Sequence, residues 1–194
     1  MRRRLLVALG VLALGIVLAI GLADSESGPA PARHRADLDA DRRALAGAPA
    51  PLARLHRQAN QVLPGGEDAF RRRLRELRGY PIVINKWGSW CGPCRAEFPL
   101  FHDEAVRLGK RVAFLGIDSL DNRESALRFL REHPVPYPSY EDPRDTLAQS
   151  LDAGRYSPVT IYMDRKGRSR YVHYGEYHSR ADLAADIRRY ALAG

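Results

Sequence analysis

The sequence predicts an α/β fold in which helices flank one mixed β-sheet. From Ile82 onward, short apolar runs alternate with helical patterns in the order strand, helix, strand, helix, strand, strand, helix. An apolar run bounded by turn residues is typical of a buried strand, whereas apolar residues three or four positions apart indicate a helix. The turn Asp164–Gly167 separates the last two strands and predicts a hairpin. Strand–helix–strand units followed by a hairpin make the expected sheet mixed.

The chain begins with a candidate export segment. Arg2-Arg3-Arg4 precedes an uninterrupted apolar run, residues 5–23, close to the ~20 residues that cross a bilayer as a helix. Basic residues stay on the cytoplasmic side, so everything after Asp24 is expected outside the cytoplasm. Gly21-Leu22-Ala23 supplies small residues of the kind a signal peptidase reads. We therefore expect residues 1–23 to be a transmembrane signal anchor that holds the protein in the cell membrane, or a signal peptide whose cleavage leaves it secreted.

Two segments separate this run from the predicted sheet. Residues 24–51 are rich in Pro, Ala, Gly, Ser and charged residues without a sustained period, and are expected to be a flexible tether. Residues 52–79 are expected to be an extension of two helices. The first carries apolar residues at helical spacing before Pro64-Gly65-Gly66: Leu52, Leu55, Ala59 and Val62. The second carries an apolar face of Phe70, Leu74 and Leu77, and arginines elsewhere: Arg71, Arg72, Arg73, Arg75 and Arg78. We interpret the arginines as a solvated face rather than a docking patch for an acidic partner or lipid headgroups.

Residues 80–194 are expected to form the main domain, and each element has a local signal. The expected strands are apolar runs bounded by turn residues: one that begins with Ile82–Ile84, then Val112–Ile117, Val159–Met163 and Ser169–Tyr174. The expected helices have apolar residues at helical spacing: about Pro93–Leu108, Arg123–Glu132, a short one at Asp145–Leu151, and one that begins at Ser179. Pro134, Pro136 and Pro138 predict an extended loop. Ser179 and Asp182 form an acidic variant of the capping box.

The chain contains two cysteines, Cys91 and Cys94, separated by Gly92 and Pro93. A disulfide that closes so small a loop stabilises little, so the value of the pair is expected to be chemical. The pair lies where a strand ends and a helix begins. Unpaired N–H groups and the dipole of a helix N-terminus stabilise a thiolate, so Cys91 is expected to have a lowered pKa and to be the attacking sulfur. Cys94, one turn inside the helix, can resolve the mixed disulfide. Pro93 suits the first helical turn.

Other uses of a cysteine pair fit the sequence less well. A tetrahedral zinc site needs four ligands, and no second pair of Cys or His has ligand spacing. Covalent haem attachment needs a histidine after the second cysteine, where the chain has Arg95. We therefore expect no metal and no cofactor. The net charge of +8 accompanies no recognised nucleic-acid-binding motif, and an exported chain does not meet nucleic acid, so no such partner is expected.

The stretch from Val83 to Pro99, with Trp90-Cys91-Gly92-Pro93-Cys94 at its centre, resembles the active-site signature of the thioredoxin superfamily. More narrowly, it is similar to the membrane-anchored, exported TlpA/ResA-type thiol–disulfide oxidoreductases. That branch includes reductases of cytochrome c maturation. The resemblance covers roughly residues 82–192 and implies a thioredoxin-like fold. The two helices expected before residue 80 stand in place of the N-terminal β-hairpin that is usual in the branch.

The resemblance also implies roles for residues beyond the cysteines. Pro158, which follows Ser157 and precedes a strand, corresponds to the family's cis-proline beside the cysteine pair. Glu97, one helical turn from Cys94, corresponds to the buried acid of the ResA-like proteins, with an ordinary surface glutamate as the alternative. Asn85 stands where cytosolic thioredoxins carry a buried aspartate, so proton transfer from Cys94 must use Glu97 or water. The implied substrate contacts come from four residues: Trp90, Gly92, Pro93 and Ser157.

Three functions remain open. In the favoured one, a reductase, reduced Cys91 attacks a disulfide in an exported client protein and Cys94 releases the product. A membrane electron-donor protein would then reduce the pair again, because the extracytoplasmic space lacks a soluble thiol pool. The Gly92-Pro93 dipeptide matches reducing thioredoxins and favours this direction. The second function is an oxidase for exported proteins. The third is a redox-inert binding or copper-handling module, which the two methionines, Met1 and Met163, support poorly.

Overall fold

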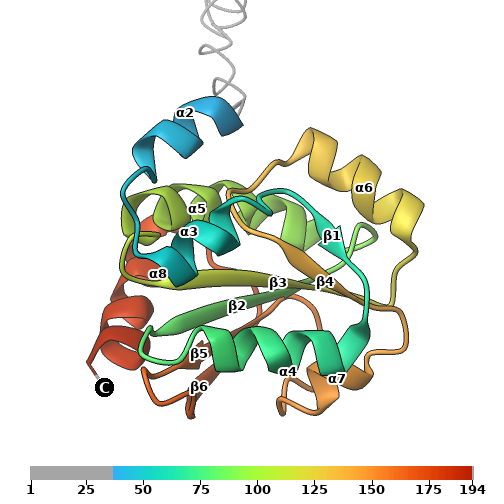
Figure 1. Ribbon diagram of the computed structural model, residues 1–194. Helices are drawn as coiled ribbons and strands as arrows, with labels where there is room; N and C mark the ends of the chain where they lie inside the picture. The colour runs from blue at the N-terminus through green and yellow to red at the C-terminus, as the bar shows by residue number, and fades with distance from the viewer. Residues whose placement is uncertain (1–36, 194) are drawn as a thin grey trace, which may run out of the picture. The chain divides into compact units, whose positions relative to one another are not determined.

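The computed structural model describes residues 37–193, which form a six-stranded sheet with helices on both faces (Figure 1). The strands are β1 (Val62–Leu63), β2 (Ile82–Trp87), β3 (Ala113–Ser119), β4 (Ser139–Asp142), β5 (Val159–Met163) and β6 (Ser169–Tyr174). The helices are α2 (Leu38–Ala44), α3 (Ala50–His56), α4 (Gly66–Glu76), α5 (Gly92–Leu108), α6 (Arg123–Glu132), α7 (Thr146–Gln149), α8 (Arg180–Asp186) and the π-helical segment η1 (Ile187–Leu192).

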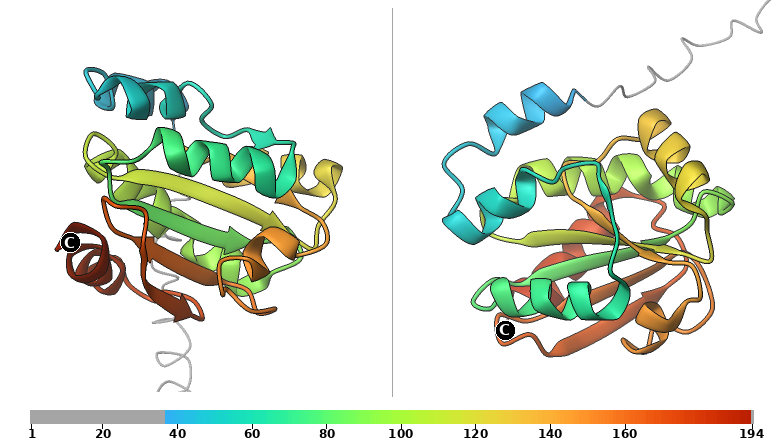
Figure 2. Two further views of the ribbon diagram at one scale, coloured as in Figure 1. Left: turned by 60° about the horizontal axis from the view of Figure 1, so that its bottom comes forward. Right: turned by 45° about the vertical axis from the view of Figure 1, so that its right-hand side comes forward.

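The sheet has the order β1-β4-β3-β2-β5-β6, so β1 and β6 lie at opposite edges (Figure 2). The first four strands of this order are parallel to one another, whereas β5 and β6 are antiparallel to their neighbours. Every residue of β2 and β3 is buried, as near-continuous apolar runs predict for central strands. The predicted mixed sheet, the helices at Pro93–Leu108 and Arg123–Glu132, and the C-terminal hairpin are confirmed.

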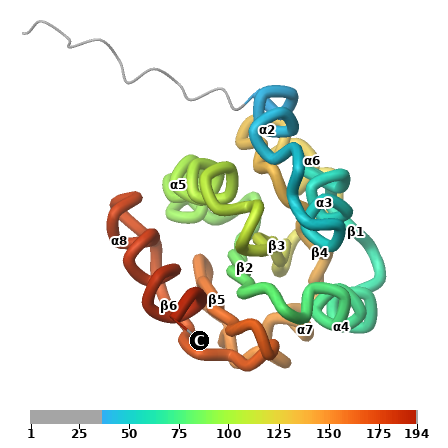
Figure 3. Tube along the Cα trace, turned by 60° about the vertical axis from the view of Figure 1, so that its left-hand side comes forward, coloured from blue at the N-terminus to red at the C-terminus, as the bar shows by residue number. Residues whose placement is uncertain are grey.

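Each face of the sheet carries its own hydrophobic core. One core joins the cysteines to aromatic residues of α5 and α6, including Phe98 and Phe129, and to α8. The other joins α3, α4 and α7 to the sheet through residues such as Leu52, Phe70 and Leu147. Figure 3 shows α5 and α8 on one side of β2 and β3, and α4 and α7 on the other. The cysteine pair therefore belongs to the α5 face.

The prediction that the first helix of the extension continues to Val62 was wrong, because this helix ends at His56. Instead of continuing as a helix, the chain turns, and Val62–Leu63 forms β1, parallel to β4 at the sheet edge. Asn60 adopts a left-handed backbone with φ 60°, its amide donates to the Leu130 carbonyl (3.1 Å), and its oxygen accepts the Val135 N–H (3.0 Å). These long-range bonds outweigh the helical spacing of the apolar residues. Residues 52–79 are thus built into the sheet and its second core.

Two other segments differ from expectation. The part of the predicted tether from residue 38 to 51 is ordered: α2 follows an Asp37 N-cap, and Asp41 of α2 lies 2.9 Å from Nε2 of His102 in α5. Strand β4, where only a proline-rich loop was expected, pairs with β3 and places Ser139 and Tyr140 in the interior. The hydrophobic pattern in the sequence is weak in both segments, because polar residues supply the contacts that hold them in the fold.

The predicted export segment, residues 1–23, lies outside the described residues. Within residues 37–193, no helix is both long enough and apolar enough to cross a bilayer.

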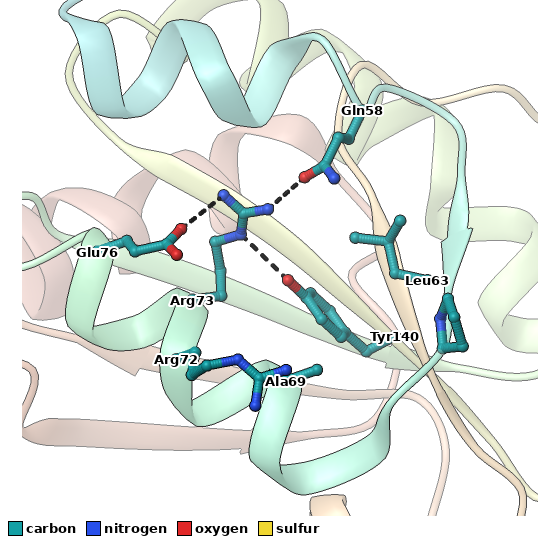
Figure 4. Close-up of a pocket in the computed structure, with 8 residues that line it drawn as sticks. Gln58, Leu63, Ala69, Arg72, Arg73, Glu76 and Tyr140 are labelled. Carbon is teal, nitrogen blue, oxygen red and sulfur yellow. Dashed lines mark hydrogen bonds and ion pairs between the residues drawn. The ribbon is translucent and has the colours of Figure 1, made fainter.

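The arginines of α4 divide into structural and solvated groups. Figure 4 shows the guanidinium of Arg73 between α3 and α4, where it donates to the Tyr140 hydroxyl (3.1 Å), to Glu76 (3.1 Å) and to Gln58. The side chain of Arg73 is 11% exposed, so it ties α4 to its neighbours. The other arginines of this segment are exposed and fit the predicted solvated face: Arg71, Arg72 and Arg75 in α4, and Arg78 just after its end.

Candidate active site

Cys91 and Cys94 lie at the junction of β2 and α5 and form a disulfide, with their Cα atoms 5.3 Å apart. Cys91 is the N-cap of α5, and its Sγ accepts the Cys94 N–H at 3.2 Å, as predicted for a sulfur at a helix N-terminus. Pro93 occupies the first turn, where an N–H has no helical partner. Cys91 is 3% exposed and Cys94 is fully buried, so Cys91 is the sulfur closer to solvent.

Glu97 is fully buried in α5, one turn beyond Cys94. Its Oε1 accepts a hydrogen bond from Nδ2 of Asn85 (2.6 Å), and its Oε2 accepts the backbone N–H of Tyr177 (3.1 Å). Burial raises the pKa of Glu97 to about 8, against the lowering effect of these two hydrogen bonds. The alternative of a surface glutamate is thereby excluded. A carboxyl that titrates near neutral pH can exchange a proton with a neighbouring thiol.

Asn85 of β2 complements Glu97 in either protonation state. Its Oδ1 is buried and has no hydrogen-bond partner among the described residues. An ionised Glu97 accepts from the amide nitrogen, as in the structure. When Glu97 is protonated, rotation of the amide by half a turn presents Oδ1 as the acceptor for the carboxyl proton. Asn85 therefore stays hydrogen-bonded through a proton transfer in which it takes no proton itself.

The Ser157–Pro158 peptide bond is cis, as the family resemblance implied. The next residue, Val159, pairs with Lys86 near the end of β2, so Pro158 lies at the sheet end from which the cysteine segment emerges. The carbonyl of Pro158 accepts the Gly175 N–H (3.1 Å). The hydroxyl of Ser157 is buried without a hydrogen-bond partner in the part of the chain that the structure describes.

An apolar groove of about 560 Å³ runs beside the cis-proline. Its lining residues come from the loop before β5 and the end of β6: Gly154, Tyr156, Ser157, Pro158, Tyr174 and Gly175. Tyr156 is 75% exposed, and Tyr174 is 54% exposed although its hydroxyl is fixed on the Asp152 carbonyl (2.8 Å). Sequence reasoning missed both tyrosines; the only signal was an aromatic residue immediately before Ser157-Pro158.

The two tryptophans of the motif have different environments. Trp87 is fully buried, donates to Ser139 Oγ (3.0 Å), and packs on the rings of Phe98 and Phe129. Trp90, next to Cys91, is 54% exposed. Gly92 and Pro93 are exposed between the buried cysteines. Of the four predicted substrate contacts, Trp90, Gly92 and Pro93 thus lie on the surface beside the cysteines, whereas the Ser157 hydroxyl is buried. Trp87 is a core residue.

A buried ion pair supports the loop before the cis-proline. Lys86 Nζ lies 2.8 Å from Oδ1 of Asp145 and donates to the Gly154 carbonyl (2.7 Å), and Ser119 also bonds to Asp145. The side chains of Lys86 and Asp145 are 0% and 2% exposed. Sequence reasoning missed this pair, because a lysine inside an apolar strand has no local signal for its partner.

Removal of one member of this pair should leave the other as an unpaired buried charge. We expect Lys86→Met to lower the free energy of unfolding by about 3 kcal/mol. Lys86→Met/Asp145→Asn, which removes both charges and keeps a residue that tolerates the left-handed backbone of position 145, should recover most of the loss. Urea unfolding of the two variants beside the parent measures both effects. Equal losses in the single and double variants would contradict a dominant charge effect.

A dithiol/disulfide pair at a helix N-terminus, a buried acid behind it and a cis-proline at the same sheet end define a thioredoxin-like thiol–disulfide oxidoreductase. Comparison with known proteins agrees. The model of the AhpC/TSA family matches residues 47–172. The chain therefore belongs to this family of thioredoxin-fold proteins.

Within the family, the chain is similar to proteins named thiol:disulfide interchange protein DsbE. It is 34% identical to that of Xylella fastidiosa over 162 residues, which cover 78% of this chain and 75% of the relative. It is 33% identical to that of Escherichia coli, with 71% and 69% covered. The Pseudomonas aeruginosa protein is 37% identical, and the match spans 59% of its length.

Solved structures agree on the fold. A DsbF homologue from Corynebacterium diphtheriae is 28% identical, with a TM-score of 0.51 over 60% of this chain and 75% of that one. A protein described as a thiol:disulfide interchange protein DsbE from Chlorobium tepidum has a TM-score of 0.55 over 60% and 83%, at 24% identity.

Proposed function

We propose that this protein reduces disulfides in exported client proteins, with Cys91 as nucleophile, Cys94 as resolving thiol and Glu97 as the group that exchanges the Cys94 proton. The observation that carries the proposal is the buried Glu97 carboxyl, held by Asn85 and Tyr177 one turn from Cys94. With a pKa of about 8, it changes protonation state at the pH at which dithiols react.

The proposed reaction is a two-electron exchange in two steps. The Cys91 thiolate attacks one sulfur of the client disulfide, forms the Cys91–client disulfide, and releases a client thiolate that takes a proton. Cys94 then transfers its proton to Glu97 and attacks Cys91 Sγ, which forms the Cys91–Cys94 disulfide and releases the second client sulfur as a thiolate. This thiolate takes a proton from water, and Glu97 returns its proton to water. The client has gained two electrons and two protons, and the protein ends in the oxidised state that the structure shows.

The groove beside Pro158 supports a binding site for an extended client segment. The backbone before the cis-proline offers polar groups at the sheet end where the disulfide lies, and Tyr156 and Tyr174 offer rigid apolar walls. Trp90, next to Cys91, offers a further exposed aromatic ring. Client classes that the family resemblance implies include the apoproteins of cytochrome c, whose haem-binding cysteines must be reduced.

Localisation and re-reduction follow from the N-terminal segment. We propose that residues 1–23 export the chain and anchor it by a single membrane span, with the folded part on the extracytoplasmic side. A membrane protein that carries a dithiol would return two electrons to the Cys91–Cys94 disulfide. The resemblance to membrane-anchored oxidoreductases supports this arrangement.

One observation favours the opposite direction as a second candidate. The unpartnered hydroxyl of Ser157, beside the cis-proline, can donate to a Cys91 thiolate and stabilise the reduced form, which would make the protein an oxidase. The structure gives no support to a copper-handling function through Met163, because this methionine belongs to the core on the other face of the sheet from the cysteines.

The reduction potential separates the two directions. We expect a value near that of thioredoxin, roughly −270 mV, because no histidine lies between the cysteines and the Glu97 carboxylate opposes a second nearby negative charge. Equilibration of the full-length protein with glutathione at known ratios measures it. A value above about −180 mV would support the oxidase. In that case Ser157→Ala should lower the potential.

A further inference from the structure

The loop between β6 and α8, residues 175–179, contacts two separate parts of the site. The Gly175 N–H donates to the Pro158 carbonyl (3.1 Å), and two residues later the Tyr177 N–H donates to Oε2 of Glu97 (3.1 Å). Gly175 has a φ of 102°, in the left-handed region that favours glycine, so the chain can leave β6 in this direction. One short loop therefore joins the cis-proline to the buried acid.

The side chain of Tyr177 is fixed by residues of three other elements. Its hydroxyl donates to Oδ2 of Asp186 in α8 (2.6 Å) and lies 2.6 Å from the hydroxyl of Tyr162 in β5. Because the Tyr177 proton goes to Asp186, the Tyr162 hydroxyl is the donor to Tyr177. The Tyr177 ring also stacks on the His173 ring of β6, with the ring centroids 4.1 Å apart. The hydrogen bonds thus run in one direction, from Tyr162 through Tyr177 to Asp186.

This anchor keeps its protons at the pH values at which Glu97 changes its charge. Tyr162 is fully buried and Tyr177 is 4% exposed. Burial raises the pKa of both tyrosines far above the ordinary value of 10, so both hydroxyls stay protonated. Burial also lowers the pKa of His173 below its ordinary value of 6.5, so the stacked ring is neutral near pH 8. The Tyr177 side chain, and the main chain attached to it, therefore stay in one place while Glu97 titrates.

The titratable residues around Glu97 come from four parts of the chain: Cys94 in α5, Glu176 and Tyr177 in the loop, Tyr162 in β5, and Tyr137 before β4. Burial and the negative charge of Glu176 disfavour the Glu97 carboxylate. Among the described residues, its hydrogen-bond donors are the Asn85 amide and the Tyr177 N–H. The Tyr177 N–H therefore supplies one of the two contacts that favour the charged acid.

We propose that Tyr177 is a positioning residue for Glu97: its hydroxyl, held between Tyr162 and Asp186, keeps its backbone N–H on the Glu97 carboxylate. The N–H stabilises the charged form of Glu97, which is the form that accepts a proton. Tyr177 exchanges no proton itself and acts through Glu97. Without the hydroxyl, the loop is released, the hydrogen bond to Glu97 weakens, and the acid holds its proton to higher pH.

The carboxyl ¹³C signal of Glu97 tests the anchor directly. Full-length oxidised protein in detergent, labelled with ¹³C at the glutamate side-chain carboxyl, gives this signal without thiol titration, and Glu97→Gln assigns it. The parent should titrate with a midpoint near pH 8. Tyr177→Phe, which keeps the ring and removes the hydroxyl, should raise the midpoint by about one pH unit. Tyr171→Phe, the same change at an exposed tyrosine of β6, is the matched control and should leave the midpoint unchanged.

Two substitutions of Asp186 separate anchoring from charge. Asp186→Ala and Asp186→Asn both remove a negative charge, which by itself would lower the Glu97 midpoint. Asp186→Asn alone keeps an oxygen that accepts the Tyr177 hydroxyl. We therefore expect a raised midpoint in Asp186→Ala, and in Asp186→Asn a midpoint no higher than that of the parent.

An unchanged or lowered Glu97 midpoint in Tyr177→Phe would overturn the proposal. An unchanged midpoint would show that the N–H stays in place without the anchor, and a lowered one would show that entry of water dominates. If Tyr177→Phe does not fold, Asp186→Ala decides by the same criterion.

Client reduction tests the consequence for turnover, which rests on the proposed function. In quenched single turnovers, the rate at which the Cys91–client disulfide resolves should rise with pH through the Glu97 midpoint. Tyr177→Phe should shift this rise upward with the carboxyl midpoint and slow resolution at pH 7 roughly fivefold. A rise that stays at the parent pH while the carboxyl midpoint moves would overturn this consequence. If the parent forms no mixed disulfide with any client, the proposed function fails, while the carboxyl titration still decides the role of Tyr177.

Discussion

Cys94→Ser is expected to accumulate covalent Cys91–client disulfides, whereas Cys91→Ser is expected to trap none. The reason is the asymmetry of the site. Cys91 Sγ caps α5 beside the exposed Trp90, while Cys94 is fully buried one turn inside the helix. Without Cys94, the first exchange step still occurs and the second cannot. Both variants should lose catalysed turnover completely, since each retains one redox-active sulfur out of the two that the exchange requires.

Non-reducing electrophoresis of the tagged full-length variants, after incubation with a disulfide-bonded client, measures the trapped species. Addition of dithiothreitol should release it. A client whose cysteines have been reduced and alkylated is the matched control and should give no adduct with either variant. Equal trapping by the two variants would contradict the assignment of Cys91 as nucleophile.

The central part of the fold could be predicted from the sequence because its signals are local and strong. The apolar runs at Ile82 and Val112, the helical spacing of Phe98 and Phe101, and the Asp164–Gly167 turn each indicate one structure. The cysteine pair and the cis-proline carried enough information to place most of the site. The helix N-terminus at Cys91 needed no tertiary knowledge, since Gly92 and Pro93 mark it.

The remainder depends on contacts between distant residues. Strand β1 has two residues and is specified by pairing with β4 and by the bonds of Asn60 to residues 130 and 135. The Lys86–Asp145 ion pair joins residues that have no shared sequence pattern. The groove tyrosines are exposed, so hydrophobic periodicity does not report them. The family resemblance implied that Glu97 is a buried acid, but its hydrogen bonds to Asn85 and Tyr177 come only from the packed structure.

Glu97→Gln is expected to abolish a large pH dependence of stability. The folded-state pKa of about 8 lies above the ordinary value of 4.5, because burial favours the neutral carboxyl. The stabilisation is complete below the unfolded pKa and is lost as pH rises through the folded one. At about 1.4 kcal/mol per pH unit, the free energy of unfolding of the oxidised parent should fall on the order of 4 kcal/mol from pH 5 to pH 8.

The variant should lose no stability from this source, since glutamine does not titrate in this range and Asn85 can turn to bond its amide. Urea unfolding of the oxidised proteins at pH 5 and pH 9 measures the difference, and Glu97→Gln should be the more stable protein at pH 9. Glu104→Gln is the contrasting control. Burial raises the pKa of Glu104, but hydrogen bonds from Arg107 and Arg180 outweigh it and lower this pKa. Loss of the Glu104 carboxylate should therefore destabilise the protein at neutral and alkaline pH.

Reduced Glu97→Gln should also show a lower apparent thiol pKa in its pH–reactivity profile, because the carboxylate that disfavours a thiolate is gone. Parallel stability curves for parent and Glu97→Gln, with unchanged thiol reactivity, would show that Glu97 keeps its ordinary pKa and does not exchange protons with Cys94.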